Sequence, residues 1–313
     1  MNRQSLFLCL MLGALPASAQ QQPDPGFQPP VPHPAYAAGA GPVVCVDQAH
    51  HNFHTLDGRF AAFGELLRRD GYVLKANTLP LDAGALAGCA ILVISNAQPS
   101  DANWADYPSP TPSAFTAAEV DATRRWVEEG GKLLLIADHM PLAGAAVSMA
   151  AAFDVGFTDG FAFAGYEADA ERPQAMAKPT IFTRADRTLA DHPVVRGRNA
   201  SETVTHVRSF TGQAFQAPPS AKPVMVLPAD FISLHPAKAW DFAPGTPKVA
   251  VGGWLQGATL EPGAGRVAFF GEAAMFTAQL AGPQRRPVGM NSPDATQNAQ
   301  FVLNLMHWLS GEL

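Results

Sequence analysis

Short apolar runs alternate with segments of helical pattern along the first half of the chain, and this alternation constrains the fold more than any other feature. Residues 42–46, 90–95 and 132–137 are continuous apolar runs of strand length. Buried parallel strands have such sequences because helices cover both faces of their sheet. Strands that alternate with helices are typical of α/β folds. The pattern therefore predicts an α/β domain with a doubly wound, mostly parallel sheet.

One helix has well-defined ends. Thr116 is a suitable N-cap, Glu119 stands at the capping-box position, and Gly130 with Gly131 can end the helix after Glu129. Four further elements are expected at these ranges: a strand at 72–76 and helices at about 56–69, 142–153 and 295–309.

The first nineteen residues have the pattern of a signal peptide. Arg3 precedes an apolar core at residues 6–12, and Ala17, Ser18 and Ala19 form a small-residue cleavage site. Cleavage after Ala19 would send the protein to the periplasm or outside the cell. Residues 20–41 are rich in proline, glycine and alanine and are expected to form a linker, followed by a single domain over residues 42–313.

Charge and cysteine content narrow the function classes. The formal net charge is −6 and no basic cluster is present, which excludes nucleic acid as an expected partner. No segment after the signal peptide is long and apolar enough for a transmembrane helix. Cys45 and Cys89 fall in or beside predicted core strands, which favours buried thiols, although an oxidising compartment also permits a disulfide. The oligomeric state is not predicted.

Residues 155–249 break the alternation and are expected to be an elaboration of loops, hairpins and edge strands. Within it, the alternating pattern at residues 160–166 favours a strand over a lid. Residues 248–254 and 265–270 are expected to pair, with 261–264 as their turn. Trp104, Tyr107 and Trp254 are candidate residues for stacking on a sugar or an aromatic ligand.

Polar residues gather directly after the predicted strands. Because the carboxyl ends of parallel strands share one edge of a sheet, and open α/β sheets bind their ligands there, we expect these side chains to form a ligand-binding site. The candidates are Asp47, His50, His51 and His54 after the first strand, Asn96 after the third, Asp138 and His139 after the fourth, and Glu272 after a late strand.

Several chemistries fit this set. His50, His54 and Asp138 are suitable ligands for a divalent metal such as zinc or manganese, with Asp47 or His139 as further donors, and a metal-bound water could then act as a nucleophile. The histidine spacing matches no established metal motif, so direct ligand contact and structural hydrogen bonding remain alternatives. Asp138 lies where α/β hydrolases place a nucleophile, but an aspartate there also caps helices.

Four segments together resemble a known domain type. Residues 43–50, 130–139, 265–272 and 304–309 are similar to the class I glutamine amidotransferase-like domains of the gliding-motility and intraflagellar-transport (GIFT) type, as found in uncharacterised bacterial proteins behind a signal peptide. The resemblance covers about residues 42–153 and 249–309 and implies a flavodoxin-like sandwich. Glutaminase chemistry needs a cysteine at the nucleophile elbow, where this sequence has Ala137, Asp138, His139 and Met140.

The resemblance associates this type of domain with ligand or carbohydrate binding and with complex assembly. The expected function is therefore a secreted amidotransferase-like domain that binds a small polar ligand, with carbohydrate as one candidate class, at the carboxyl ends of its strands. A metal-dependent hydrolase and a structural component of the cell envelope are the alternatives.

Overall fold

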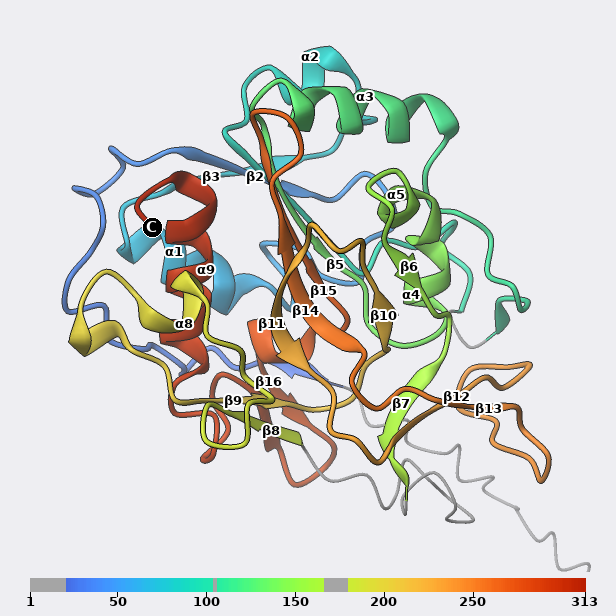
Figure 1. Ribbon diagram of the computed structural model, residues 1–313. Coiled ribbons are helices and arrows are strands. Elements are labelled where there is room, and N and C mark those ends of the chain that lie inside the picture. The colour runs from blue at the N-terminus through green and yellow to red at the C-terminus, as the bar shows by residue number, and fades with distance from the viewer. Residues whose placement is uncertain (1–20, 104–105, 166–179) are drawn as a thin grey trace, which may run out of the picture.

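The computed structural model describes residues 21–103, 106–165 and 180–313 (Figure 1). The expected signal peptide, Trp104 and Tyr166 lie outside these residues. Within them, a nine-stranded mixed sheet forms the centre, and three smaller sheets accompany it. In Figure 1 the strands of the smaller sheets lie below the large one. No described helix is long and apolar enough to cross a membrane.

Five neighbouring strands of the large sheet are parallel. Their order is β3-β2-β4-β5-β15, and each pairs in parallel with the next. The bounds are β2 Val43–Asp47, β3 Val73–Asn77, β4 Ile91–Ser95, β5 Lys132–Ile136 and β15 Arg266–Phe270. All five residues of β4 are buried, as the continuous apolar sequence requires of a central strand. The strands expected near residues 42–46, 90–95 and 132–137 are thus confirmed.

The other four strands of the sheet pair antiparallel, so the sheet is mixed, where a doubly wound, mostly parallel sheet was expected. A turn at residues 261–264 joins β14 (Leu255–Leu260) to β15, and so short a connection allows only antiparallel pairing. Beyond β14 follow β10 (Phe215–Gln216) and β6 (Gly156–Phe157), while β11 (Lys222–Val226) also pairs with β14.

The strand that pairs with β15 was predicted at the wrong residues. Residues 248–254 contain only β13 (Lys248–Ala250), which pairs with β12 (Phe231–Leu234) in another sheet. Both segments carry apolar residues, and periodicity does not decide which of two nearby apolar segments pairs with a given strand.

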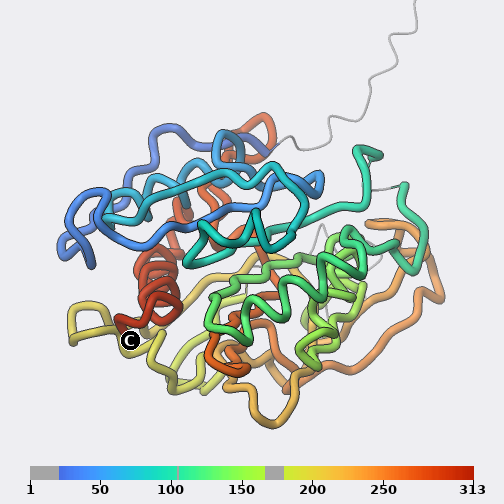
Figure 2. The backbone as a smooth tube through the Cα atoms, turned by 90° about the horizontal axis from the view of Figure 1, so that it is seen from above, coloured from blue at the N-terminus to red at the C-terminus, as the bar shows by residue number. Residues whose placement is uncertain are grey.

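Helices cover both faces of the parallel strands. In Figure 1 α1 (Ala61–Arg69) and α9 (Asn298–Ser310) lie to the left of the sheet, whereas α4 (Leu142–Ala145) and α5 (Val147–Ala151) lie to its right. The view from above separates α9, in red, from α3 (Ala117–Glu128), in green (Figure 2).

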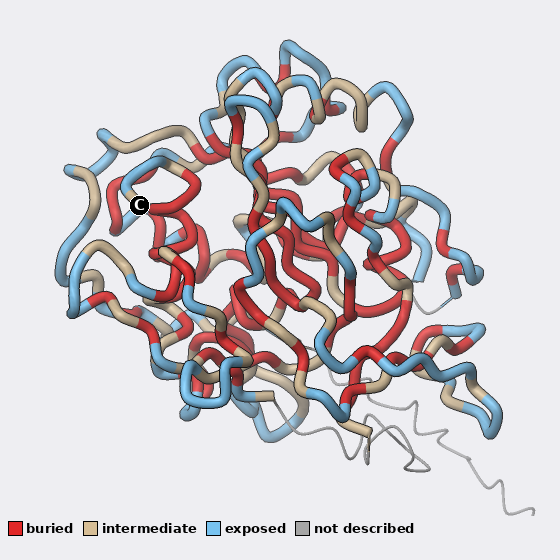
Figure 3. The backbone as a smooth tube through the Cα atoms, viewed as in Figure 1, coloured by how far each residue is buried: buried red, intermediate tan, exposed pale blue. Residues whose placement is uncertain are grey.

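Successive strand residues face opposite cores. Val44 and Val46 pack in the cluster that contains residues of α1 and α9, and Cys45 packs in the cluster that contains residues of α2 (Ala83–Leu86) and α5. This alternation is the pleat of a strand buried on both sides. Figure 3 accordingly shows the buried residues concentrated in the central strands and in α9.

The predicted cap of α3 is present, and the other helix boundaries differ. Thr116 and Glu119 form the capping box, with both reciprocal hydrogen bonds. The segment at 56–60 is a turn, because the amides of Gly58 and Phe60 both donate to the carbonyl of Thr55, so α1 begins later than expected. The expected helix at 142–153 is divided into α4 and α5 at Ala146.

Residues 21–41, the described part of the segment expected as a linker at 20–41, pack along the domain. β1 (Gln22–Pro23) pairs with β16 (Ala278–Ala281), which in turn pairs with β17 (Arg286–Gly289). Further along, the rings of Tyr36 and Tyr72 meet edge to face at 5.1 Å. Gly71 is required beside them, because its φ is +94° and an added Cβ would lie 2.4 Å from the Tyr36 carbonyl oxygen.

The two described cysteines form a disulfide, which was the permitted alternative to the favoured buried thiols. Cys45 lies on β2, and Cys89 lies in the short return from α2 to β4, with 5.6 Å between their Cα atoms. This separation falls in the range that a disulfide spans. The two residues meet because β2 and β4 are neighbours in the sheet.

The elaboration at residues 155–249 consists mainly of short strands, as expected. Its further strands are β7 (Phe161–Ala164), β8 (Thr180–Thr183) and β9 (His206–Ser209), and its described helices are the single turns α8 (Pro193–Arg196) and η2 (Ala200–Glu202). β7 confirms the strand expected from the alternation there and pairs with β12. β6, β10 and β11 extend the large sheet, so this region and the parallel strands share one structure.

Candidate functional site

Three parallel strands end level with one another. Ser95 of β4 pairs with Ile136 of β5, and Ile136 pairs with Phe270 of β15. Asn96, Asp138 and Glu272 follow these residues directly or two positions later. Because β15 runs parallel to β5, Glu272 reaches the same edge of the sheet as the other two. The strand-end argument therefore places these three side chains together.

A cleft with a volume of about 1280 Å³ opens at this edge. Five of the eight candidate residues line it: His54, Asn96, Asp138, His139 and Glu272. Side chains that the sequence did not single out complete the lining, among them Phe53, Arg59, Trp240, Gln279 and Arg285. The cleft thus combines charged, amide and aromatic groups from distant parts of the chain.

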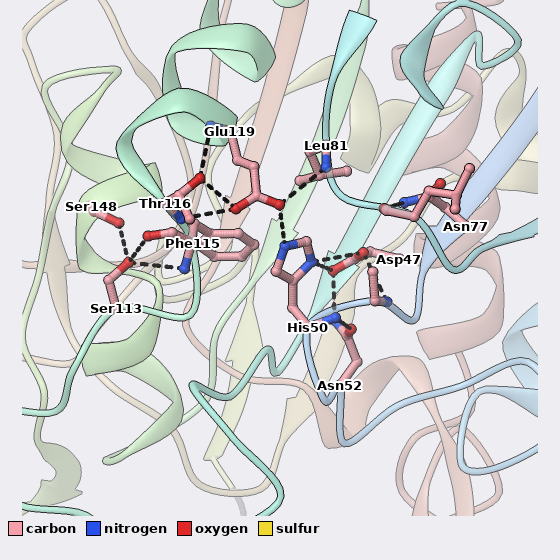
Figure 4. Close-up of polar contacts among 12 residues, drawn as sticks. Asp47, His50, Asn52, Asn77, Leu81, Ser113, Phe115, Thr116, Glu119 and Ser148 are labelled. Carbon is pink, nitrogen blue, oxygen red and sulfur yellow. Dashed lines mark hydrogen bonds and ion pairs between the residues drawn. The ribbon is translucent and has the colours of Figure 1, made fainter. Parts of the chain in front are cut away.

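Asp47 and His50 lie outside the cleft, in a buried cluster of their own (Figure 4). His50 Nδ1 lies 2.9 Å from Asp47 Oδ2, and its Nε2 lies 2.9 Å from Glu119 Oε1. The Asp47 carboxylate also accepts hydrogen bonds from the amide of Ala49 and from the side chain of Asn52. These contacts shape the loop after β2 and attach it to α3.

Each charged group in this cluster stabilises the charged form of its neighbour. Burial lowers the pKa of His50, but its hydrogen bonds and charge interactions with Asp47 and Glu119 outweigh burial, and the net pKa is raised. Burial raises the pKa of Glu119, but hydrogen bonds from Thr116, His50 and Leu81 prevail and lower it to about 2. An imidazolium between two carboxylates is therefore the favoured state at mildly acidic pH.

His51 is also outside the cleft. Its side chain is 41 % exposed, and its Nδ1 contacts the carboxylate of Asp101. The backbone at His51 is left-handed, with φ +46°, and turns the side chain of the next residue, Asn52, toward Asp47. His51 thus belongs to the surface of the loop.

The structure does not assemble the metal site considered for His50, His54 and Asp138. Both ring nitrogens of His50 contact carboxylates, and Nδ1 of His54 lies 2.8 Å from the hydroxyl of Ser95. No group of three or more histidine, cysteine, aspartate or glutamate side chains is arranged for metal binding in the described part of the chain. The spacing suggested shared ligands, but hydrogen-bond partners from β4 and α3 separate them.

Asn96 connects the ends of β4 and β5. Its Oδ1 accepts a hydrogen bond from the amide of Asp138, and its carbonyl accepts one from the amide of Phe53. The backbone is left-handed, with φ +48°, a conformation that asparagine adopts more readily than most residues. Asn96 therefore fixes the backbone position of Asp138 at the cleft.

Glu272 is a buried carboxyl beside Asp138. It is 1 % exposed, and its two oxygens accept hydrogen bonds from the amides of Ala274 and Met275 at the start of η3 (Ala274–Phe276). Burial, and then the negative charge of Asp138, raise the pKa of Glu272 well above its ordinary value. Asp138 itself is less buried, and its Oδ1 caps the amide of His139.

His54 forms a neutral part of the cleft. Burial, and then the positive charge of Arg59, lower the pKa of His54 to about 3. Its ring stacks on Phe60 with 4.7 Å between the centroids. Arg59 lies over the ring of Phe53 at 3.6 Å and donates to the carbonyl of Gln21.

An aromatic wall stands at the Asp138 end. His139 stacks on Phe161 and meets the Trp240 ring edge to face, in each case with 4.6 Å between the centroids. The Nδ1 of His139 lies 2.7 Å from the carbonyl of Met140, which orients the ring. Trp240 was missed because it lies in the elaboration, where no strand-end rule applies, and the other stacking candidates in the described residues, Tyr107 and Trp254, do not line the cleft.

Known proteins share the fold rather than the sequence. No protein-family model and no curated protein matches the chain. The mmIFT52 N-terminal domain superposes with a TM-score of 0.57 at 11 % identity, over 85 % of this chain and 97 % of that one. A putative ThuA-like protein from Bacteroides uniformis ATCC 8492 has a TM-score of 0.46 at 11 % identity, over 90 % of this chain and 95 % of that one. The fold of this chain is thus shared with the IFT52 domain.

Proposed function

We propose that this protein is an exported, amidotransferase-like domain that binds a small polar ligand, with carbohydrate as the favoured class, in the cleft at the carboxyl ends of β4, β5 and β15. The observation that carries the proposal is the lining of this cleft. It combines the carboxyl groups of Asp138 and Glu272, the side chain of Gln279 and the ring of Trp240 in one cavity. A large concave site with a few convergent polar groups is the usual form of a small-molecule site.

The strand order supports a flavodoxin-like assignment for the parallel half of the sheet. In chain order the strands β2, β3, β4, β5 and β15 are first to fifth, and their spatial order is second, first, third, fourth, fifth. This is the flavodoxin-like order, in which ligands bind beyond the carboxyl ends of the strands. The cleft lies at that edge.

A sugar fits the two kinds of surface in the cleft. A sugar ring presents a rim of hydroxyl groups and a face of C–H groups. Carboxylate and amide oxygens accept hydrogen bonds from hydroxyls, and an aromatic ring such as that of Trp240 packs against the apolar face. Glutaminase chemistry has no support, because both described cysteines are joined in a disulfide and Asp138 stands at the strand end.

The disulfide also supports export. Disulfides persist in oxidising compartments and are rare in reducing ones. The Cys45–Cys89 bond closes a long segment of the core, with a sequence separation of 44 residues. It agrees with the periplasmic or secreted location expected from the first nineteen residues.

The test is binding of glycans and metabolites to residues 20–313, by array screening followed by calorimetry. Trp240→Ala should weaken binding of a sugar ligand about 3- to 10-fold, as expected for loss of one aromatic contact. His50→Gln is the matched control, because His50 lies outside the cleft. If no sugar bound, or if Trp240→Ala left every binding constant unchanged, the proposed function would be wrong.

A further inference from the structure

We propose that the ligand of this cleft is an anionic carbohydrate, whose anionic group lies between Arg59 and Arg285 and whose hydroxyl group donates a hydrogen bond to Gln279. The inference rests on the proposed function, since it takes the cleft as a carbohydrate site and specifies the class of sugar. It follows from the distribution of charge along the cleft and from one buried acceptor in its wall.

The two arginines of the cleft are both connected to the small sheet formed by β1, β16 and β17. Arg59 donates to the carbonyl of Gln21, and the next residue, Gln22, pairs with Leu280 of β16. Arg285 lies in the turn between β16 and β17. Arg59, which is bonded to this small sheet through Gln21, and Arg285, which belongs to its turn, both line the cavity.

The two carboxyl groups of the cleft come from a different part of the fold, and Asp138 carries the negative charge that raises the pKa of Glu272. Asp138 and Glu272 follow β5 and β15, and the aromatic wall of His139 and Trp240 adjoins Asp138. A ligand with a single anionic group is therefore repelled from the strand ends and attracted to the arginines. This polarity gives the ligand one preferred orientation in the cleft.

Arg59 benefits from an anionic partner. Burial lowers the pKa of its guanidinium, and no carboxylate among the described residues offsets that cost. Its present polar partner is a carbonyl, at 3.3 and 3.4 Å from its two nitrogens. A guanidinium binds a carboxylate or a phosphate through two parallel hydrogen bonds, which are stronger than bonds between neutral groups. The same arginines disfavour a cationic ligand.

Gln279 supplies an independent indication of a ligand. Its side chain is 1 % exposed, and its Oε1 has no hydrogen-bond partner among the described residues. The orientation of the amide is fixed, because the Thr277 hydroxyl donates to the carbonyl of Ala274 and so accepts from Gln279 Nε2. Oε1 is therefore an unsatisfied acceptor in a residue that lines the cleft. A buried acceptor without a partner costs free energy that a ligand hydroxyl would recover.

The experiment compares neutral and anionic forms of the same sugars by calorimetry. Glucose, galactose and mannose are each measured as the free sugar, the uronate and the 6-phosphate. We expect at least one anionic form to bind about 10-fold or more tightly than its neutral parent, which is the effect of one charge-assisted hydrogen bond. Preference for uronates or for phosphates identifies which anion the arginines recognise.

Two variants test the two contacts. Arg285→Asn should abolish the preference for the anionic form, and asparagine tolerates the left-handed backbone of Arg285, whose φ is +50°. Arg286→Asn is the matched control, because Arg286 is also exposed but does not line the cleft. Gln279→Met should weaken binding of neutral and anionic sugars alike, about 10-fold, without lowering the melting temperature of the ligand-free protein.

The outcomes separate this inference from the proposed function. If neutral sugars bound as tightly as their anionic forms, and Arg285→Asn changed nothing, the inference would be overturned while the cleft remained a sugar site. A fall in melting temperature for Gln279→Met with unchanged affinity would assign Gln279 a structural role and remove its part of the inference. If none of the nine sugars bound, both the inference and the carbohydrate assignment would fall.

Discussion

His50 and Glu119 connect two parts of the fold that are 69 residues apart in the chain, with Nε2 of the imidazole 2.9 Å from Oε1 of the carboxylate. The same carboxylate caps α3 through its other oxygen, which accepts from Thr116. Asp47 holds the opposite nitrogen of the ring. The loop after β2 is thereby fixed to the first turn of α3 by residues that do not line the cleft.

Glu119→Gln tests this connection. Glutamine retains the capping box but removes the negative charge beside His50. We expect the free energy of unfolding to fall by about 1–2 kcal/mol, the usual effect of losing a hydrogen bond between charged groups. Chemical denaturation measures it, with Glu129→Gln at the exposed C-terminal end of the same helix as the control. Equal stability of the two variants would contradict a stabilising role for the contact.

The same variant should have a pH-dependent effect. The folded pKa of His50 is raised above its ordinary value of 6.5, so its contribution is complete below about pH 6.5 and is lost as pH rises through the folded pKa. The folded pKa of Glu119 is lowered from 4.5 to about 2, so its contribution is complete above about pH 4.5 and is lost as pH falls toward 2. The difference in melting temperature between wild type and Glu119→Gln should therefore be largest between about pH 4.5 and 6.5. A difference that grew steadily up to pH 9 would show that the imidazolium is not involved.

Reduction of the Cys45–Cys89 disulfide should destabilise the protein. A cross-link that closes 44 residues lowers the entropy of the unfolded chain by an amount equivalent to about 4 kcal/mol at 25 °C. The measurement is denaturant unfolding with and without a phosphine reductant. The double variant Cys45→Ala, Cys89→Ala serves as the control and should be equally stable in both conditions. Wild-type stability that did not respond to verified reduction would contradict the expected contribution.

Asp138→Asn should lower the pKa of Glu272. The negative charge of Asp138 is one cause of the raised pKa, and asparagine removes that charge while its Oδ1 can still accept from the amide of His139. Burial is the larger cause and remains, so the pKa should stay above its ordinary value. Carbon-13 NMR titration of the glutamate carboxyl groups measures the change, and Asp106→Asn, at an exposed site, is the control. An unchanged titration of Glu272 would mean that the two carboxyl groups do not interact.

Asp138→Asn should also change how the stability of the protein depends on pH, in a direction that follows from the pKa of Glu272. Because the folded pKa of Glu272 lies above its ordinary value of 4.5, wild type loses stability as pH rises from about 4.5 through the folded pKa. The variant should lose less over that interval. Its melting temperature relative to wild type should therefore be higher at pH 8 than at pH 4.

Local signals in the sequence predicted the parts of the fold that local interactions determine. The continuous apolar run of β4 and the capping box at Thr116 each specify an element without help from distant residues. The predicted partner of β15 was wrong although the turn at 261–264 was predicted correctly, because apolar character does not distinguish residues 248–254 from residues 255–260, which form the pairing strand. The disulfide was left open, because its formation depends on how closely Cys45 and Cys89 approach in the folded chain.

The site residues also divide into those that the local sequence predicts and those whose positions depend on distant contacts. The position of Asn96, Asp138 and Glu272 beside one another was predicted correctly, because the ends of parallel strands share an edge. His50 was misplaced, because nothing near it in the sequence shows that Glu119 occupies its second nitrogen. Gln279 and Trp240 carry no local signal, since their positions depend on a hairpin and on an elaboration that pack against the strand ends. Arg285 was visible only as one of an arginine pair in a polar segment.

Asp70→Ala should both destabilise the domain and release the segment at residues 31–36. Asp70 is fully buried, and its carboxylate accepts from the amide of Ala35 at 2.8 Å and contacts Nε2 of His307 at 2.7 Å. Alanine leaves both groups without a partner in the interior, which costs about 3–5 kcal/mol. Hydrogen exchange should then be faster at Ala35 and Tyr36, whose amides both bond to Asp70.

The exposed Asp57 provides the control, because Asp57→Ala removes the same side chain from a site without buried partners. The Tyr36 amide bonds to the backbone carbonyl of Asp70, which alanine retains, so its exchange reports release of the segment rather than loss of one acceptor. If Asp70→Ala accelerated exchange at Ala35 alone, the carboxylate would satisfy a single amide and would not hold the segment. Faster exchange at both amides would show that the carboxylate of Asp70 anchors the segment at residues 31–36.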